Sequence, residues 1–433
     1  MPGDRVLVTG SAGHLGEALV RVLRARGHDV TGLDVLASPF TTVVGSITDR
    51  ATVRACLAGT GTVLHPATLH KPHVGSHTRQ DFVDTNVTGT LTLLEEAAAA
   101  GVGSFVFTST TSTFGRALTP APHAPAAWIT EEVVPVPRNI YGATKTAAED
   151  LCALIHADHG LPVVILRTSR FFPEPDDVDD VRDAYPDANI KANEFLYRRA
   201  DVSDVVDAHL LAMARAPAIG FGRYIVSATT PFTPGDLAAV RADAPAVVRR
   251  LFPDQEAEYA RRGWQMFGHI DRVYVNERAR ADLGWSPAYD FRRVLDLLKA
   301  GEDPRSPLAA RSAPRGTTRS PPARTRCASA QPPQRLEDLV RPVRPVLPRG
   351  GVPVRARRAS SFARTMSGSR GSTGSGSSHQ SSGRRLLVIL ICVMAVPSAQ
   401  YPGPRKLRRT GGGKLSARPA AGSQLTNDVL LTG

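Results

Sequence analysis

The sequence predicts an α/β fold, a parallel sheet covered by helices on both faces. Short β-branched runs alternate with amphipathic stretches over the first three hundred residues. These stretches are about ten residues or longer, the length of a crossover between parallel strands. A chain of 433 residues with 42% hydrophobic content is also long enough to bury a sizeable core.

Six runs are predicted as strands of this sheet. They cover residues 6–8, 30–33, 43–44, 62–65, 105–107 and 163–166. The helices predicted between them cover residues 15–26, 82–99 and 141–156. Beyond about residue 170, where Pro and Gly separate the segments, we expect a smaller lobe that contains helices at 202–214, 277–283 and 291–298 and a strand at 223–227.

Charge divides the chain near residue 304. Residues 1–304 carry 30 basic and 37 acidic side chains, a net charge of −7, whereas residues 305–433 carry 23 and 3, a net charge of +20. The second part is rich in Arg, Ser, Pro, Gly and Ala, a composition that cannot offset the entropy cost of ordering. We expect a disordered basic tail there. Binding to nucleic acid or an anionic membrane stays open, but a non-native, out-of-frame extension is favoured.

Cysteine spacing and apolar runs indicate the compartment. The four cysteines, Cys56, Cys152, Cys327 and Cys392, are far apart, so neither a disulfide framework nor a zinc ribbon is predicted. No secretory leader precedes the first strand, and the longest apolar run, 386–396, is shorter than the roughly 20 residues of a membrane-spanning helix. We expect a cytoplasmic protein without a membrane span.

A glycine-rich turn follows the first predicted strand. It reads Gly10-Ser11-Ala12-Gly13-His14-Leu15-Gly16 and leads into a helix. Glycines allow a sharp turn close to a pyrophosphate, and the helix amino end offers unpaired N–H groups. Asp34 ends the second strand, where its carboxylate accepts hydrogen bonds from a ribose and repels a 2′-phosphate. The pattern therefore predicts NAD rather than NADP as the cofactor.

Together with Tyr141-Gly142-Ala143-Thr144-Lys145 downstream, this turn resembles the extended short-chain dehydrogenases/reductases, the NAD-dependent epimerase/dehydratase family. Further matches are residues 63–67, 86–90, 107–110, 201–205 and 283–287. The resemblance covers roughly residues 4–300. It implies a Rossmann-type doubly wound sheet with an NAD-binding domain over 1–170, a small C-terminal substrate lobe over 171–304 and the tail over 305–433.

Tyr141 and Lys145 are predicted to carry the chemistry. They are four residues apart, so both lie on one helix face, and an ammonium near the phenol favours the phenolate. Tyr141 is then the general base or acid for a hydroxyl proton. The resemblance implies that Lys145 also holds the nicotinamide ribose and that Thr110 hydrogen-bonds the reacting oxygen. Ser109 and Ser112 remain rivals of Thr110.

The resemblance implies the remaining site residues. The cofactor site comprises Gly10, Ala12, Gly13, His14, Leu15, Gly16, Asp34, Ser46, Ile47, Ala67, Asn86 and Ser109, with Tyr141 and Lys145. The substrate site comprises Thr110, Ser112, Arg198 and Arg199, of which the two arginines are candidates for phosphate. Two departures matter. Ser46 replaces an aspartate that contacts adenine in the family, and Thr111-Ser112 replaces the Asp-Glu pair of 4,6-dehydratases, so water loss by that route is not expected.

The function predicted is hydride transfer at a hydroxyl or carbonyl carbon of a sugar, sugar nucleotide or similar small molecule, by an epimerase or a net oxidoreductase. A cofactor-sensing regulator without turnover is the alternative. We expect no metal, because a loop lining the substrate cleft is favoured over a zinc site for His70, His73 and His77. No nucleic-acid partner is expected, and a homodimer is left open.

Overall fold

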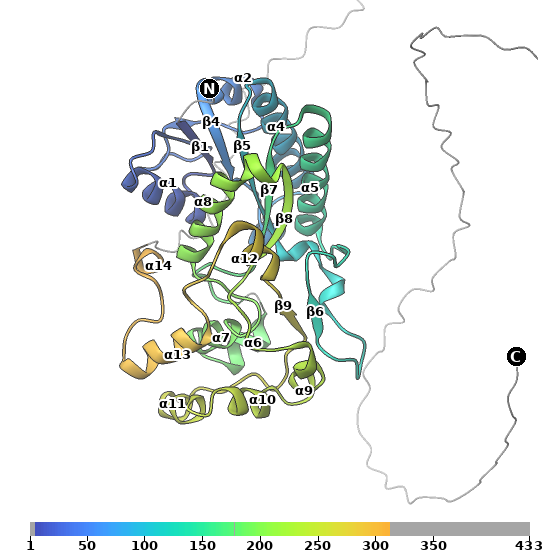
Figure 1. The fold of residues 1–433 in the computed structure, drawn as a ribbon, viewed down its shortest axis with the longest axis vertical. Helices are drawn as coiled ribbons and strands as arrows, with labels where there is room; N and C mark the ends of the chain where they lie inside the picture. The colour runs from blue at the N-terminus through green and yellow to red at the C-terminus, as the bar shows by residue number, and fades with distance from the viewer. Residues whose placement is uncertain (1–4, 177, 312–433) are drawn as a thin grey trace, which may run out of the picture. The chain divides into compact units, whose positions relative to one another are not determined.

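A seven-stranded parallel sheet, in the order β3-β2-β1-β4-β5-β7-β8, forms the centre of the fold (Figure 1). The computed structural model describes residues 5–176 and 178–311. The strands of the sheet are β1 (Arg5–Thr9), β2 (Val30–Asp34), β3 (Val43–Val44), β4 (Thr60–His65), β5 (Ser104–Thr110), β7 (Val163–Thr168) and β8 (Phe221–Val226). The strand order reverses between β1 and β4, which is where parallel sheets of this kind bind ligands.

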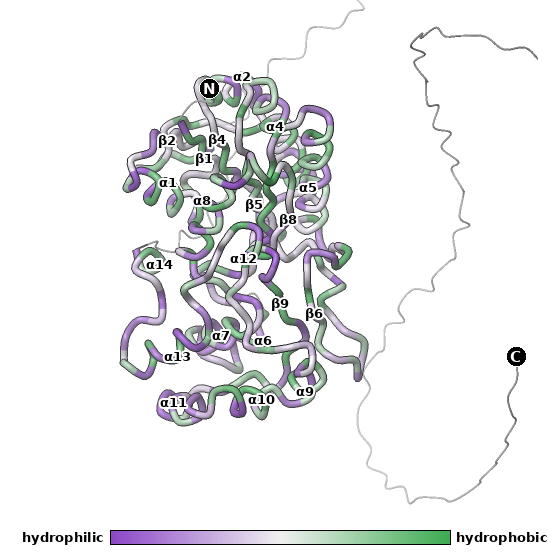
Figure 2. Tube along the Cα trace, in the orientation of Figure 1, coloured by the Kyte–Doolittle hydropathy of each residue, from purple (hydrophilic) through white to green (hydrophobic). Residues whose placement is uncertain are grey.

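Helices cover both faces of the sheet (Figure 1). One face carries α1 (His14–Ala25) and α8 (Val202–Ile219), and the other carries α2 (Arg50–Leu57), α4 (Gly89–Ala99) and α5 (Ile140–His159). Alternation along β1 explains the two cores, because Val6 and Val8 pack with α1 whereas Leu7 packs on the opposite face. Figure 2 shows the apolar residues along the central strand β5.

A second group of elements forms a smaller lobe around its own apolar core, which includes Leu196, Val240, Val248, Phe291 and Leu295. Its longer elements are α6 (Asp179–Ala184), α7 (Asp187–Glu194), α9 (Leu237–Ala242), α10 (Ala244–Leu251), α11 (Gln255–Arg262) and α13 (Phe291–Ala300), with β6 (Ala127–Ile129) paired in parallel to β9 (Arg272–Tyr274). The helices α12 (Glu277–Leu283) and α14 (Pro307–Arg311) instead pack on the α8 side of the sheet domain. Single turns complete the fold at η1 (Lys71–Gly75), α3 (Arg79–Val83), η2 (Asp84–Thr88), η3 (Thr111–Thr113), η4 (Arg116–Leu118) and η5 (Pro234–Asp236).

The predicted fold class is confirmed, and all six predicted strands of the first part are present. The helix predicted over 82–99 is divided, because the π-helical turn η2 separates α3 from α4. The pair β6 and β9 was not predicted, since each strand has three residues and the two lie far apart in the sequence.

The boundary predicted at residue 304 needs correction. Residues beyond it belong to the fold, because the Ser306 backbone N–H donates to an Asp201 carboxylate oxygen at 3.1 Å and Leu308 and Ala309 pack against the core under α8. The rest of the predicted tail, 312–433, lies outside the described residues. Among the helices described in residues 5–176 and 178–311, none has the length and apolar character needed to cross a membrane.

Candidate active site

The glycine turn joins β1 to α1 at the carboxyl edge of the sheet. Gly10 has a φ of 62°, and a Cβ on it would lie 2.8 Å from the Ala67 backbone, so only glycine fits. A Cβ on Gly16 would lie 2.0 Å from the Gly10 carbonyl oxygen, so glycine is also what lets α1 pack against the turn. Gly13 is exposed and is the N-cap residue of α1, so no side chain caps the first N–H groups of this helix. The turn therefore packs closely against the amino end of α1, and binding of an anionic group there stays a prediction.

The other residues predicted for the adenosine end lie beside this turn. The Asp34 carboxylate accepts hydrogen bonds from the Ala12 and Leu36 backbone N–H groups, both at 2.9 Å, so it is held at the end of β2. Leu15 is buried in the core on the α1 side of the sheet, and Ile47 is buried in the core on the opposite side. Ser46 is half-buried, and its hydroxyl is within 2.8 Å of the Thr48 hydroxyl.

Three predicted catalytic side chains meet where β5 ends against α5. The Tyr141 ring and the Thr110 side chain are both buried, and Thr110 lies close enough to the phenol to lower its pKa. Lys145, one turn further along α5, is 2% exposed, and its Nζ donates to the Thr108 carbonyl at 2.7 Å. That ammonium also lies 3.8 Å from the centre of the Phe107 ring, a cation–π contact.

Burial dominates the electrostatics of this group. It raises the pKa of Tyr141 to about 12, against the opposing effect of the Thr110 hydrogen bond, and it lowers the pKa of Lys145 to about 7, against the charge of Glu149. The protein's own groups therefore leave the phenol protonated near neutrality, and the effect of the Lys145 ammonium on Tyr141 stays a prediction. The reason is desolvation of the phenol, together with a lysine ammonium that is turned toward a strand carbonyl.

The structure separates the three rival hydroxyls. Ser109 has another partner, because its Oγ donates at 2.5 Å to Glu149, eight residues beyond Tyr141 on α5. Ser112 lies in the turn after β5, where its backbone N–H donates to the Thr110 Oγ1 at 3.1 Å. Of these hydroxyls, Thr110 is the one that acts on the pKa of Tyr141.

Sequence reasoning missed a buried ion pair beneath the site. Arg167 donates to Glu149 through both Nη2 and Nε, at 2.7 and 3.1 Å, and the two side chains are 4% and 2% exposed. Ser109 completes this group from β5. Glu149 follows Lys145 by four residues, so its position on the same helix face was the signal that could have revealed it.

Asn86 ties three segments together in the π-helical turn η2. Its Oδ1 accepts from the Leu69 backbone N–H at 2.8 Å, and its Nδ2 donates to the Leu69 carbonyl and to the Thr144 hydroxyl at 2.9 and 3.1 Å. The asparagine thereby fixes the segment after β4 against α5. Ala67, the residue that closes on Gly10, lies in the same segment.

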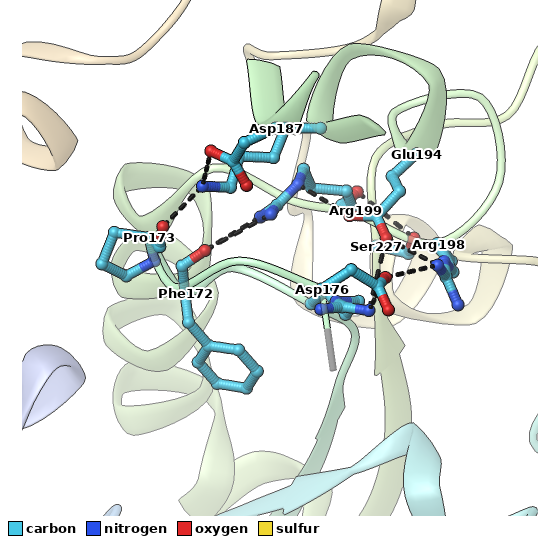
Figure 3. A network of polar contacts seen from close by, with 10 residues as sticks. Phe172, Pro173, Asp176, Asp187, Glu194, Arg198, Arg199 and Ser227 are labelled. Atoms are coloured by element: carbon cyan, nitrogen blue, oxygen red, sulfur yellow. Dashed lines mark hydrogen bonds and ion pairs between the residues drawn. The ribbon is translucent and has the colours of Figure 1, made fainter. Parts of the chain in front are cut away.

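Arg198 and Arg199 lie elsewhere, in an ion network at the carboxyl end of β7 (Figure 3). Glu194 is 2.7 Å from Arg198 and 3.1 Å from Arg199, and Asp176 is 2.6 Å from Arg170 and 3.2 Å from Arg198. Both carboxylates are buried. Phosphate binding by the two arginines stays a prediction. In this structure both arginines form ion pairs with carboxylates of the protein itself.

Aromatic rings gather over the same edge. We call them the aromatic belt: His14, His70, His73, Phe171 and Phe172. Ring centres are 6.1 Å apart for His14 and Phe171, 4.7 Å for Phe171 and Phe172, and 6.1 Å for Phe172 and His70, while those of His70 and His73 are 4.4 Å apart. The belt thus joins the segments that follow β1, β4 and β7. In residues 5–176 and 178–311, no group of three or more His, Cys, Asp or Glu side chains is placed to hold a metal ion.

Comparison with known families assigns this arrangement. The family model described as "NAD dependent epimerase/dehydratase family" matches residues 6–226, about half of the chain. The chain belongs to the NAD-dependent epimerase/dehydratase family. The match runs from β1 through β8 and includes the glycine turn, Asp34 and the Tyr141 and Lys145 pair. The predicted family is therefore confirmed, and NAD is the cofactor by which the family is defined.

Individual members and structures are similar over different lengths. A 3-beta-hydroxysteroid dehydrogenase of Mycolicibacterium neoaurum is 37% identical over 118 residues, which are 25% of this chain and 32% of that protein. A UDP-glucose 4-epimerase of Streptomyces lividans is 28% identical over 249 residues, 49% of this chain and 72% of that protein. The chain thus spans only about a third of the first relative's length.

A solved structure shows the same fold. It is a short-chain dehydrogenase/reductase superfamily protein from Agrobacterium tumefaciens with bound NAD, 24% identical, with a TM-score of 0.51 over 68% of this chain and 96% of that one. Within the NAD-dependent epimerase/dehydratase family, this chain therefore has the expected sheet and helices.

Proposed function

We propose that this chain is an enzyme that transfers hydride between NAD and a hydroxyl or carbonyl carbon of a small molecule, with Tyr141 as the proton donor and acceptor. The substrate is a sugar, a sugar nucleotide or a similar compound, and the reaction is an epimerisation or a net oxidation. The observation that carries the proposal is the burial of Tyr141 beside Thr110 at the sheet edge that also carries the glycine turn.

The glycine turn supports the cofactor part of the proposal. The tight contacts of Gly10 and Gly16 leave backbone N–H groups at the amino end of α1 for a pyrophosphate, and the fixed Asp34 carboxylate suits ribose hydroxyls. NAD supplies the hydride acceptor and donor when it is bound. Ala12, Gly13, His14 and Ala67 line this turn, and Ser46 and Ile47 follow β3 beside it.

The proton chemistry follows from the positions of Tyr141 and Thr110. A substrate hydroxyl that binds beside Thr110 is also within reach of Tyr141. Thr110 then holds the substrate oxygen while Tyr141 accepts its proton. Because burial raises the pKa of Tyr141 to about 12, the phenol needs positive charge nearby to act as a base. Lys145 is the cationic group on the same helix face, and we assign it to this role and to the nicotinamide ribose.

A cofactor-sensing regulator with the same fold is the alternative. Such a protein needs the glycine turn and Asp34 but has no need of a buried phenol beside a threonine hydroxyl. The Tyr141 and Thr110 pair therefore favours the enzyme.

The test follows nicotinamide absorbance at about 340 nm while the purified protein is incubated with NAD and a panel of sugars, sugar nucleotides and alicyclic alcohols. Steady accumulation of reduced nicotinamide identifies an oxidoreductase. Inversion of a hydroxyl without net absorbance change, detected by NMR, identifies an epimerase. Tight NAD binding without any conversion across the panel would instead support the regulator.

A further inference from the structure

The charges at the carboxyl end of β7 are paired with one another within the protein. Glu194 lies on α7, is fully buried, and contacts Arg198 and Arg199, while Asp176 is 4% exposed and contacts Arg170 and Arg198. Although burial by itself raises a carboxyl pKa, the three arginines outweigh it, and the pKa of Glu194 lies below its usual value. Glu194 therefore stays ionised at neutral pH.

A diphosphate would meet these carboxylates. A diphosphate that pairs with Arg198 or Arg199 would lie beside the like charge of Glu194. If it instead displaced Glu194, that buried carboxylate would lose its cationic partners, which is costly in a low-dielectric interior. The surrounding segment adds to the repulsion, because residues 170–199 contain 8 acidic and 5 basic side chains. Lys191 is also engaged, with the Asp187 carboxylate at 2.6 Å and the Pro173 carbonyl.

The same network holds the aromatic belt in place. Arg199 donates to the Phe172 carbonyl at 3.2 Å, and Lys191 donates to the Pro173 carbonyl at 2.5 Å. Figure 3 shows that the Phe172 ring points away from the arginines. The ring instead lies against His70, and Phe171 lies against His14 beside the glycine turn. The arginines therefore hold the backbone of this segment, while its rings contact the belt histidines His14 and His70.

The histidines of the belt add no positive charge. Burial lowers the pKa of His70 and of His73 to about 4, with a smaller contribution from the neighbouring histidine in each case, and it also lowers the pKa of His14. These rings are neutral at physiological pH. The belt offers partly buried, uncharged ring faces across the ends of three strands.

We propose that the reacting ring of the substrate packs on the aromatic belt and that the substrate is a neutral alicyclic alcohol or ketone without a phosphate group. The inference rests on the proposed function, because it concerns the same site and the same hydride transfer. It narrows that function from small molecules in general to those whose binding depends on apolar contact.

The first test measures binding without turnover. The full-length protein, saturated with NAD, is titrated calorimetrically with UDP and with UDP-glucose. We expect dissociation constants of about 1 mM or weaker. Binding of either compound in the micromolar range would overturn the inference.

Removing one counter-charge gives the reverse experiment. Asp176→Asn keeps the side-chain size but removes the carboxylate that lies 2.6 Å from Arg170 and 3.2 Å from Arg198. Glu194 then remains as the one acidic partner of both arginines among the ion pairs of the described residues, so UDP affinity should rise about tenfold. Asp179→Asn is the matched control, because that carboxylate is 82% exposed and pairs only with Arg182 nearby. If folded Asp176→Asn protein gains no affinity, the counter-charges do not exclude phosphate and the inference is wrong.

The positive test uses NAD reduction with cyclohexanol and with the fused-ring alcohol 2-decalol. Both should be oxidised, the larger ring with the lower KM, and Phe172→Ala should raise KM about tenfold while leaving NAD affinity unchanged. Phe221→Ala is the control, because Phe221 begins β8 at the opposite edge of the sheet.

The possible results separate this inference from the proposed function. Oxidation or epimerisation of UDP-glucose that depends on Tyr141 would refute the substrate class and leave the hydride-transfer function intact. Absence of conversion of both alcohols and sugar nucleotides by NAD-binding protein would refute the hydride-transfer function itself.

Discussion

At Tyr141, two effects compete for the acidity of one phenol. Burial disfavours the phenolate and raises the pKa to about 12, whereas the Thr110 hydrogen bond lowers it by a smaller amount. A general base is most effective when its pKa is near the working pH. The buried Lys145 ammonium can favour the Tyr141 phenolate only while it stays protonated. Glu149, on the next turn of α5, raises the pKa of Lys145 and so favours the protonated form.

Glu149 should matter for stability as well. Glu149→Gln leaves Arg167 buried without a countercharge, so we expect the free energy of unfolding in urea to fall by about 3–5 kcal/mol. The matched control is Glu95→Gln, since the Glu95 and Arg50 pair is 39% and 48% exposed and should contribute less than about 1 kcal/mol. Equal losses in the two variants would show that burial of the Arg167 pair is not what stabilises it.

Asp34 should set the choice between NAD and NADP. Calorimetric titration is expected to show tighter binding of NAD, because the carboxylate held by Ala12 and Leu36 repels a 2′-phosphate. In Asp34→Ala the preference should narrow by about tenfold, equivalent to about 1.4 kcal/mol. NADP binding as tightly as NAD to the unaltered protein would refute this role.

At the scale of elements, the junction between β1 and α1 leaves no room for a side chain. Gly16→Ala places a Cβ 2.0 Å from the Gly10 carbonyl oxygen, so α1 must shift and the cradle at its amino end is lost. We expect a loss of about 1–3 kcal/mol in unfolding free energy and at least tenfold in NAD affinity. Gly268→Ala is the control, because nothing lies within 4 Å of a Cβ there. Unchanged NAD binding by Gly16→Ala would contradict the placement of the cofactor.

The elements that the sequence made predictable are those with local signals. Strong β-branched runs revealed β1, β2 and β7, and the glycine turn between strand and helix indicated the cofactor site. The pair β6 and β9 depends on a long-range contact between three-residue strands, for which no local pattern exists. The spacing of Glu194 and Arg198 was visible as a helical pair, but its burial depends on how α7 packs in the lobe.

At the scale of the whole molecule, the described residues form a sheet domain and a lobe whose last element returns to the sheet domain. α14 brings Leu308 and Ala309 against the α8 side of the core, and Ser306 bonds to Asp201. Composition placed the end of the fold at residue 304. Charge and low complexity are averaged over many residues, so they do not reveal a single short helix such as α14.

Truncation should locate the true end of the fold. A chain that ends at Arg311 should keep the NAD affinity and thermal stability of the full protein, whereas one that ends at Pro304 loses the contacts of α14 and should be less stable by about 1–2 kcal/mol. Thermal unfolding of both chains measures this difference. Loss of NAD binding by the chain ending at Arg311 would show that residues 312–433 take part in the fold or its assembly.

The most direct test of the central claim is the turnover of Tyr141→Phe on whichever substrate the panel identifies. The variant keeps the buried ring and removes the hydroxyl that lies beside Thr110. We predict that kcat falls about a hundredfold or more, with NAD affinity and thermal stability close to those of the unaltered protein. Unchanged kcat in a folded, NAD-binding Tyr141→Phe variant would contradict the account.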